Sequence, residues 1–556
     1  MIQRSLLRSF LFVTKKISPV LVLVLILIVF SNCSKRKSGE QPVLDSAYVT
    51  QYMNSKPAFA DDLYWAMQFY KARDYKLGWF KNHELVPESQ KLLNVVSKSA
   101  EEGLELSNYG VVDISALIKE LQGVKRDLDK RDRLEKEIDI ALSATYFNWA
   151  SDYYRGMLEP RETKKADWDV KRNRMKLDLA LQSVLGERES NLPYKDFQPM
   201  HPEYANLKKA LANYRRIKAA GGWPKIPAGA SVAVGQPSSV VPALRKRLAA
   251  LISQDTIKNA GASNVFDQNL SAALKKFQEQ NGLPATGKLN SETVRFMNIP
   301  VEDRIRQVVI NMERWRWIPQ SFEPNYLIVN IPEFRLRLYE GGKEKMSMKV
   351  IVGKELNSTP VFSDQMEHVV LAPYWNIPPG ILKDEIAPKV ASNPGFLEAM
   401  DMEVIGKDGN PVDPTSVDWS AAGTGNFPYT VRRRPGPKND LGQVKFIFPN
   451  SMNIYLHDTP STELFNQSKR DFSHGCVRVE KPIDLAAYLL RDTGWDRSKI
   501  MDQVSKHEEK YVPLKKKLPV YLVYFTASAD ASGRVRFYDD IYGHDSKLKS
   551  MYFSKL

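Results

Sequence analysis

An α+β protein of several domains is the fold class that this sequence predicts, and three observations lead to it. A chain of 556 residues is long enough for about 3 to 4 domains of ordinary size. Apolar residues recur at helical spacing in the first half, and from about residue 326 they alternate with period two, as in strands. The 43% of hydrophobic residues and the lack of a glycine triplet repeat exclude a disordered or collagen-like chain.

The first 33 residues have the anatomy of an export leader. Residues 1–16 hold four basic side chains and no acidic one, and the apolar run 17–30 follows them. That run is shorter than the roughly 20 apolar residues of a membrane-spanning helix, which favours a signal peptide. Cys33 comes next, where a lipoprotein carries its lipidated thiol, so lipidation at Cys33 and an uncleaved anchor both stay open. We expect an exported, periplasmic protein attached to the membrane.

The chain is basic and poor in cysteine. It has 80 Lys and Arg against 65 Asp and Glu, and removal of residues 1–32 leaves 76 against 65, a net charge of +11. This charge fits either a solvated basic surface or an anionic partner in the cell envelope. Nucleic acid is not an expected partner, because the leader takes the chain out of that compartment. If Cys33 carries lipid, Cys476 has no second cysteine with which to form a disulfide.

Residues 42–236 are predicted to form a helical scaffold domain. The stretch rich in Gly, Pro and Ala at 219–239 is its first clear non-helical connection. Within 134–153, apolar residues are spaced by three or four positions and so lie along one stripe of a helix. This stripe consists of Leu134, Ile138, Leu142, Tyr146, Trp149 and Tyr153.

Residues 237–300 are predicted to form a small unit of three helices, and 301–325 a connector. Pro242 can open the first helix, Asn281-Gly282 can end the second, and Asn290 or Ser291 can cap the third. The expected core residues are Leu244, Leu248 and Leu251, then Leu270, Ala273, Leu274 and Phe277, then Val294 and Met297.

Residues 326–515 are predicted to form a mainly β domain, followed by a C-terminal strand and hairpin at 516–556. Alternation around 334–338, a turn at 340–343 and a return at 348–352 indicate a hairpin. Residues 373–440 hold too many Pro, Gly and Asn for a packed sheet, so we expect an inserted lid there. Further strands are expected at 367–372, 443–448, 453–457 and 519–526, with a hairpin around Ser532-Gly533.

A histidine and a cysteine form the candidate catalytic pair. His457 ends an apolar predicted strand, and Cys476 follows 19 residues later, directly after Ser473, His474 and Gly475. A free thiol has a pKa of about 8.5, so little of it is the reactive thiolate at neutral pH. A neighbouring imidazole that takes the proton makes the thiol reactive at that pH. Gly475 allows backbone N–H groups to turn toward an oxyanion. The pattern therefore predicts acyl transfer through Cys476.

These residues resemble a known family signature. His457, a gap of 15 residues and the run 473–478 (SHGCVR) are similar to the signature of L,D-transpeptidases with a YkuD-type catalytic domain. The likeness extends through 434–442 and 445–450. Residues 237–300 resemble a peptidoglycan-binding domain. The remaining likenesses are to the large multi-domain members: their connector at 311–317, and their scaffold at 155–160 and 221–224.

The resemblance implies a two-step reaction on peptidoglycan stem peptides. Cys476 would attack the L-centre carbonyl of diaminopimelate at the third stem position, expel D-alanine and form a thioester. An amine of a second stem would then give a 3→3 cross-link. Water as acceptor would make the enzyme an L,D-carboxypeptidase, and a protein amine would make it a tethering enzyme. The resemblance implies no cofactor, peptidoglycan stems and glycan as partners, and inactivation by carbapenems.

The resemblance also implies roles for the residues around the pair. His457 would act as general base and then acid, and a backbone carbonyl is expected to set its tautomer. The amides of Gly475 and Cys476 would form the oxyanion hole, and Tyr455 would line the acyl pocket.

The remaining candidates would contact substrate or orient the cysteine loop. Ser473 and His474 could have either role. Arg478 could pair with a stem carboxylate or form an internal salt bridge. In an extended run only the first and third of three arginines share a face, so of 432–434 we expect Arg434 alone to reach substrate.

Other classes of protein fit the residues less well. The order of His before Cys argues against papain-like enzymes, and no HExxH or CxxC pattern indicates a metal site. A non-catalytic wall-binding lipoprotein stays as an alternative, against which the intact His457, Gly475 and Cys476 argue.

Overall fold

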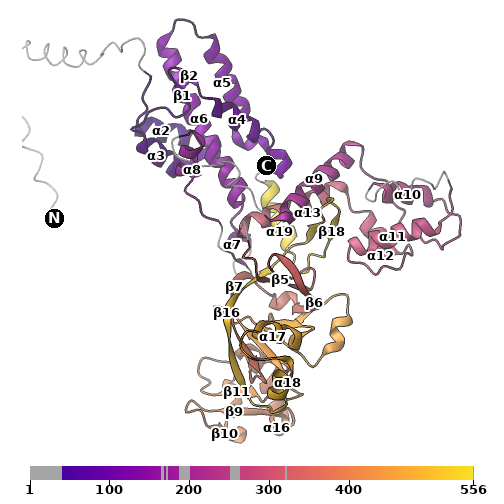
Figure 1. The fold of residues 1–556 in the computed structure, drawn as a ribbon. Coiled ribbons are helices and arrows are strands. Elements are labelled where there is room, and N and C mark those ends of the chain that lie inside the picture. Colours follow the sequence, from indigo (N-terminus) through magenta and orange to yellow (C-terminus); the bar gives the residue numbers. More distant parts are fainter. Residues whose placement is uncertain are drawn as a thin grey trace, which may run out of the picture.

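Three lobes make up the protein, and they meet around one helix, α13 (Val301–Trp317) (Figure 1). The computed structural model describes residues 41–163, 168–170, 173–186, 201–250, 263–319 and 322–554. A helical lobe, a three-helix lobe and a β-rich lobe each contain buried apolar residues, which confirms the predicted α+β multi-domain class. Within these residues, no helix combines the length and apolarity needed to cross a membrane. The predicted leader and Cys33 lie outside them.

The helical lobe is built around α6 (Leu128–Arg155), a helix of 28 residues. The Asp127 side chain caps its first turn by accepting a hydrogen bond from the Lys130 amide at 2.9 Å. Every residue of the predicted apolar stripe is buried. The other elements of this region are α2 (Ser46–Ser55), η1 (Pro57–Asp62), α3 (Leu63–Ala72), β1 (Phe80–Lys81), β2 (Glu84–Leu85), α4 (Pro87–Val96), η2 (Ser99–Glu102), η3 (Leu106–Tyr109), α5 (Val111–Gly123), α7 (Pro160–Thr163), β3 (Trp168–Asp169), α8 (Leu177–Val184) and α9 (Pro202–Ala219).

The three-helix lobe contains α10 (Val241–Ala249), α11 (Gln268–Gln280) and α12 (Ser291–Met297). Asn290 is the cap of α12, because its side chain accepts from the Thr293 amide at 2.8 Å. The predicted core residues of the three helices are buried, apart from Leu251, which lies outside the described residues.

The predicted connector contains α13, which is buried on nearly all sides, although it carries several charges. Arg314 forms an ion pair with Asp545 at 2.6 Å. Arg316 donates to the Glu102 carbonyl at 2.6 Å and to the Tyr204 hydroxyl at 2.8 Å. Helix α13 therefore joins the helical lobe to the C-terminal segment through paired, buried guanidinium groups.

The β-rich lobe is a sheet that closes on itself. Strand β12 pairs with β13 on one edge and with β7 on the other, so the order β12-β13-β15-β6-β5-β4-β16-β7 returns to its start. Strand β14 pairs with β6, and β3 from the helical region pairs with β7. The strands are β4 (Tyr326–Asn330), β5 (Arg335–Glu340), β6 (Lys343–Gly353), β7 (Val361–Leu371), β12 (Val444–Ile447), β13 (Leu456–His457), β14 (Asp471–Ser473), β15 (Val477–Val479) and β16 (Lys510–Val523).

Short helical elements and a hairpin complete this lobe. Helix α17 belongs to the same apolar core as the closed sheet, while β17 and β18 form the hairpin predicted around Ser532-Gly533. The elements are η6 (Glu355–Asn357), η10 (Thr462–Asn466), α17 (Pro482–Leu490), α18 (Arg497–Ser505), β17 (Ala527–Ala529), β18 (Val535–Phe537) and α19 (His544–Ser554).

The insertion at 373–440 is itself folded, which corrects the expectation that it holds no packed sheet. Four short strands pair in the order β10-β9-β11-β8 over an apolar core of their own. We call residues 373–440 the lid. Its elements are β8 (Trp375–Asn376), α14 (Pro379–Ile381), η7 (Leu382–Ile386), α15 (Ala387–Ser392), α16 (Phe396–Ala399), β9 (Met402–Ile405), β10 (Pro411–Val412), η8 (Pro414–Ser416), η9 (Trp419–Ala421) and β11 (Thr430–Arg433).

Three features of the predicted β-rich region differ from the structure. The division at 515/516 falls inside β16, which pairs with both β4 and β7. The segment after it ends in helix α19, which was not predicted. The strand predicted at 453–457 is shorter, because the Asn450 side chain bonds both the amide and the carbonyl of Ile454 and holds a turn there.

Candidate active site

A cavity of about 380 Å³ lies between the closed sheet and the lid. Both sides contribute polar and apolar side chains. The sheet side and its loops contribute Leu441, Tyr455, His457, Ser473, His474, Cys476 and Arg478, and the lid contributes Trp375, Pro378, Ile381, Glu385, Ile386, Lys389, Phe396, Met400, Arg433 and Asp440.

The pairing of β13 with β15 places the predicted pair in this cavity. The two strands are parallel, with Leu456 beside Val477 and His457 beside Arg478. Cys476 directly precedes β15 and lies next to Tyr455, whose carbonyl accepts from the Val477 amide at 3.2 Å. Because side chains two apart share a face of a strand, Tyr455 and His457 both turn to the cavity, with ring centroids 5.7 Å apart.

The hydrogen bond made by His457 determines which of its nitrogens can act as a base. Nδ1 lies 2.5 Å from the Asp458 carbonyl oxygen. A carbonyl can only accept, so Nδ1 carries the proton and Nε2 is the basic nitrogen. Burial, then Arg478 and Lys445, lowers the pKa of His457 to about 3, so the imidazole is neutral at physiological pH. The backbone partner expected from the sequence is thus the carbonyl of Asp458.

The Cys476 thiol is also held neutral at rest. Burial raises its pKa, and this effect outweighs the opposing hydrogen bonds from Tyr455 and the charges of Lys445 and Arg478. The thiol donates to the Asn453 carbonyl at a distance of 3.7 Å. A neutral thiol in the same cavity as a neutral imidazole fits proton transfer at the moment of attack rather than a resting thiolate–imidazolium pair.

Ser473 orients the loop that carries the cysteine. Its hydroxyl donates to the Cys476 carbonyl at 2.6 Å and accepts from the Gly475 amide at 3.2 Å. The Gly475 amide is therefore engaged by Ser473 in this structure, and its donation to an oxyanion stays a prediction. Gly475 has φ +112°, a conformation that favours glycine and explains that residue in the loop.

Of the three arginines at 432–434, Arg433 lines the cavity, whereas Arg434, the one predicted to reach substrate, does not. Arg432 and Arg434 share a face, as expected, and both contact Glu403, at 2.6 and 2.9 Å, which directs Arg434 away from the cavity. Arg433 points the other way, lines the cavity and pairs with Asp440. The pairing of β11 between β8 and β9 decides this orientation.

His474 and Arg478 both line the cavity, while the roles predicted for them stay predictions. His474 Nε2 forms a contact of 2.9 Å with Glu385 of the lid. Arg478 lies on β15 beside His457. Sequence reasoning assigned no role to Lys445, whose ammonium lies 3.9 Å from the centre of the Tyr455 ring. Lys445 lies opposite His457 because β12 pairs with β13, and no local sequence pattern predicts that pairing. The sequence marked Lys445 only as part of the run 445–450, which resembles the family.

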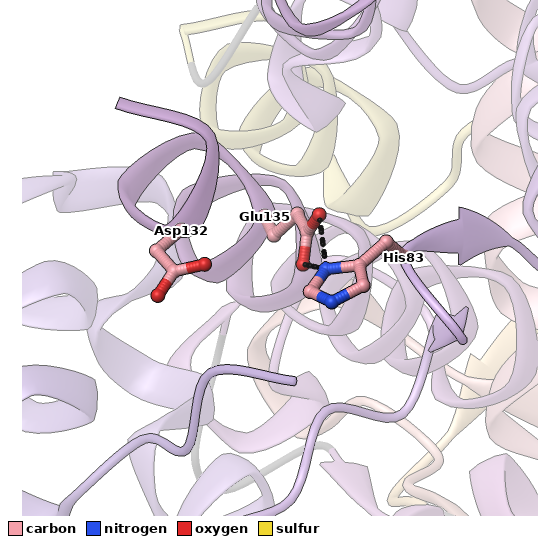
Figure 2. Close-up of side chains that lie close together, drawn as sticks. All are labelled: His83, Asp132 and Glu135. Atoms are coloured by element: carbon pink, nitrogen blue, oxygen red, sulfur yellow. Dashed lines mark hydrogen bonds and ion pairs between the residues drawn. The ribbon is translucent and has the colours of Figure 1, made fainter. Parts of the chain in front are cut away.

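One group of side chains in the helical lobe has the composition of a metal site. His83, in the turn between β1 and β2, faces Glu135 and Asp132 on α6 (Figure 2). His83 Nδ1 lies 3.0 Å from both carboxylate oxygens of Glu135. This contact engages Nδ1 and both oxygens, so the ion pair accounts for the arrangement as an anchor of the β1–β2 turn on α6.

The fold and this site define a multi-domain protein with a cysteine–histidine cavity on a closed sheet. Three family models match it: the Scaffold domain at residues 65–211, the "Putative peptidoglycan binding domain" at 238–297 and the L,D-transpeptidase catalytic domain at 324–512. The match at 324–512 confirms the resemblance of this part of the chain to a YkuD-type L,D-transpeptidase catalytic domain.

One curated relative is similar to part of the chain. A "Putative L,D-transpeptidase" of Haemophilus influenzae is 36% identical over 254 residues, which are 46% of this chain and 51% of that protein. The chain thus spans about half the length of this relative.

Similar solved structures include two L,D-transpeptidases. An L,D-transpeptidase from Mycobacterium smegmatis is 13% identical, with 36% of this chain and 58% of that chain covered and a TM-score of 0.18. One from Xylanimonas cellulosilytica is 14% identical, with coverages of 54% and 98% and a TM-score of 0.17. These TM-scores are too low to support an argument about this chain.

Proposed function

We propose that the protein is a cysteine-dependent L,D-transpeptidase that forms 3→3 cross-links in peptidoglycan. It would cleave the bond between diaminopimelate and D-alanine in a tetrapeptide stem, through a thioester on Cys476. One observation carries the proposal: Cys476 and His457 line the same cavity, and the Asp458 carbonyl leaves His457 Nε2 as the base.

In the first step, Sγ of Cys476 attacks the L-centre carbonyl carbon of diaminopimelate while His457 Nε2 takes the thiol proton. The Cys476 amide is the candidate donor to the oxyanion, since the Gly475 amide bonds to Ser473. The carbon–nitrogen bond to D-alanine then breaks, and His457 returns its proton to the leaving amine. The thioester retains the energy of the peptide bond, so no nucleotide is required.

In the second step, an amine of another stem attacks the thioester carbon. His457 Nε2 removes a proton from that amine, the carbon–sulfur bond breaks, and the thiolate of Cys476 recovers its proton. The lid covers the cavity and would favour the amine over water, because a covered site limits hydrolysis of the thioester. Access of water would instead give an L,D-carboxypeptidase, and a protein amine would give a tethering enzyme.

Positive charge in the cavity suits the carboxylates of a stem peptide. Arg433 and Lys389 contribute it from the lid and Arg478 from β15. The unit matched at 238–297 would hold the glycan, and the leader, with Cys33 as lipidation candidate, would keep the enzyme at the membrane on the periplasmic side.

Analysis of cell walls tests the cross-linking activity. Walls from cells that contain the wild-type protein, Cys476→Ala or Arg434→Gln as sole source would be digested and searched by mass spectrometry for diaminopimelate–diaminopimelate dimers. We expect dimers with the wild type and with Arg434→Gln, and none with Cys476→Ala. Dimers that persist unchanged in the alanine variant would refute the proposal. Tripeptide stems without dimers would indicate the carboxypeptidase.

A labelling experiment tests the nucleophile separately. A carbapenem should form a covalent adduct on the peptide that contains Cys476, and the same peptide should be unmodified in His457→Ala over the same interval. If the wild-type protein binds isolated walls but neither forms the adduct nor changes the stems, the non-catalytic wall-binding lipoprotein is the better description.

A further inference from the structure

The hydroxyl group of Tyr542, in the C-terminal segment, is hydrogen-bonded to the backbone next to the candidate active site. Tyr542 stands between β18 and α19, and 4% of its surface is exposed. Its hydroxyl donates to the Gly353 carbonyl, at the end of β6, at 2.5 Å. The same oxygen accepts from the Thr359 amide at 3.2 Å. One side chain thus bonds both ends of the segment that leads from β6 to β7.

Thr359 connects Tyr542 to residues 473–476, which we call the cysteine loop. Its hydroxyl donates to the Gly475 carbonyl at 2.7 Å and accepts from the Gly353 amide at 2.9 Å. Thr359 is fully buried, so these bonds are shielded from competing water. Gly475 directly precedes Cys476, and its carbonyl belongs to the peptide unit that carries the Cys476 amide.

The Gly475 Cα lies against the backbone of β6 at Gly353. A Cβ atom built on Gly353 would overlap the Asn357 carbonyl and stand 3.0 Å from the Gly475 Cα. Because protein interiors are close-packed, a shift of the Gly353 peptide is transmitted to the loop. The hydroxyl of Tyr542 holds that peptide by its carbonyl oxygen.

Tyr542 is in turn anchored far from the cavity. Its amide donates to the Tyr524 hydroxyl at 2.9 Å. Helix α19, which begins two residues later, carries Asp545, the partner of Arg314 on α13. Tyr552 on the same helix donates to the Gly103 carbonyl of the helical lobe at 3.1 Å. All of these C-terminal residues lie beyond the range 324–512 matched by the catalytic family model.

We infer that Tyr542 is a positioning residue for the nucleophile. Through Thr359 it holds the Gly475 carbonyl, and with it the Cys476 amide and thiol, in the geometry required for attack. The C-terminal segment thereby contributes one buried hydroxyl to the support of the cysteine loop. The inference rests on the proposed function in one respect, that Cys476 is the nucleophile.

Two tyrosine variants of the full-length protein separate positioning from stability. Tyr542→Phe removes the hydroxyl beneath the loop, and the matched control Tyr552→Phe removes a buried hydroxyl that also donates to a backbone carbonyl. We expect similar losses in melting temperature. Tyr542→Phe alone should slow carbapenem acylation, with a maximal rate about 3- to 10-fold lower and a half-saturating concentration near that of the wild type, because the cavity lining is intact.

Hydrogen exchange provides a readout that does not depend on activity. Amides in the peptide that covers 473–477 should exchange at least about 3-fold faster in Tyr542→Phe, and at the wild-type rate in Tyr552→Phe. Thr359→Val should behave like Tyr542→Phe, whereas Thr359→Ser, which keeps the hydroxyl, should behave like the wild type. The threonine pair also covers the case in which Tyr542→Phe does not fold.

Equal effects of Tyr542→Phe and Tyr552→Phe on both loop exchange and acylation would overturn the inference. So would wild-type behaviour of Thr359→Val. Failure of the proposed function is distinguishable, because a wild-type protein that a carbapenem does not acylate would still show the difference in loop exchange between the two tyrosine variants.

Discussion

At the scale of single residues, the protonation states of His457 and Cys476 determine how the site can react. Burial lowers the pKa of the imidazole and raises the pKa of the thiol, so both groups are neutral at rest. A neutral thiol is less reactive than a thiolate toward adventitious electrophiles. The Asp458 carbonyl accepts the proton of His457 Nδ1 in a hydrogen bond, which leaves Nε2 of the neutral imidazole unprotonated.

The buried His457 should make stability depend on pH. Its pKa is lowered from 6.5 to about 3, so the unfolded chain binds more protons between those values. The contribution of His457 to the free energy of unfolding is therefore complete above pH 6.5 and is lost as pH falls toward 3. In urea unfolding, His457→Gln should lose less stability than the wild type between pH 7 and pH 4.5. Parallel profiles would contradict this, and the half-buried His368→Gln serves as control.

Arg433 and Arg434 offer a matched pair for testing substrate recognition. Arg433 lines the cavity, whereas Arg434 contacts Glu403 on the other face of β11. Because a lost charge-assisted hydrogen bond costs about 1.5–3 kcal/mol, Arg433→Gln should lower kcat/KM for a tetrapeptide donor about 10-fold or more. Arg434→Gln should stay within about 2-fold of the wild type, a difference that product analysis by mass spectrometry would measure. Equal losses in the two variants would count against a substrate role for Arg433.

At the scale of elements, the lid is a separately packed unit that touches the cysteine loop. Its apolar core does not merge with that of the closed sheet. Glu385, in the π-helical turn η7, reaches His474 across the cavity at 2.9 Å. Such turns are frequent at functional sites, since the extra residue turns side chains out of the regular helical register.

The contact between Glu385 and His474 should bias the lid toward the closed position. Both side chains are partly exposed, at 45% and 36%, so the pair contributes at most about 1 kcal/mol, which suits a contact that opens and closes. Glu385→Gln should leave the melting temperature unchanged and speed hydrogen exchange in 379–392. Glu398→Gln, at an exposed lid position, is the control. Unchanged exchange in Glu385→Gln would show that the contact does not hold the lid.

At the scale of the whole molecule, α13 acts as the common core of three lobes. The guanidinium groups of Arg314 and Arg316 are buried, and they contact groups from remote segments, Asp545 and the Glu102 carbonyl. Buried charges of this kind specify one arrangement of the lobes, because an incorrect arrangement leaves a charge unpaired. The cavity and the helical lobe are thereby connected through the C-terminal segment.

Loss of one partner in this core should destabilise the chain strongly. Arg314 and Asp545 are almost fully buried, so Asp545→Asn should lower the free energy of unfolding by about 3–5 kcal/mol, measured from the first urea transition. The exposed pair of Arg306 and Asp303 provides the control, and Asp303→Asn should cost about 1 kcal/mol or less. A small effect at Asp545 would mean that the ion pair does not hold the lobes together.

Predictions from the sequence were most successful where the signal is local. The apolar stripe of α6, the cap at Asn290 and the hairpin of β5 and β6 follow from spacing and turn residues close together in the chain. Cys476 and His457 were selected by their motif, and the structure places both in one cavity, while their catalytic roles remain a prediction.

Errors occurred where the outcome depends on remote partners. Alternation along the strand correctly grouped Arg432 with Arg434, but the face that meets the cavity depends on how β11 packs in the lid. The small sheet of the lid was missed because its strands are only two to four residues long and are separated by Pro and Gly. The Gly475 amide was assigned to the oxyanion without knowledge that the Ser473 hydroxyl accepts its hydrogen bond, and this assignment stays a prediction.

The amino-acid sequence by itself determined the helical and β segments, the likeness to a catalytic domain and the two residues on which the proposed chemistry depends, because backbone sterics, side-chain spacing and a short motif are properties of neighbouring residues. Only the tertiary structure decided that β12 closes the sheet on β7, that Arg433 and not Arg434 meets the cavity, and that Tyr542 lies beneath the cysteine loop. These outcomes depend on the packing of segments far apart in the chain, and no local pattern encodes which remote group will occupy a given buried position.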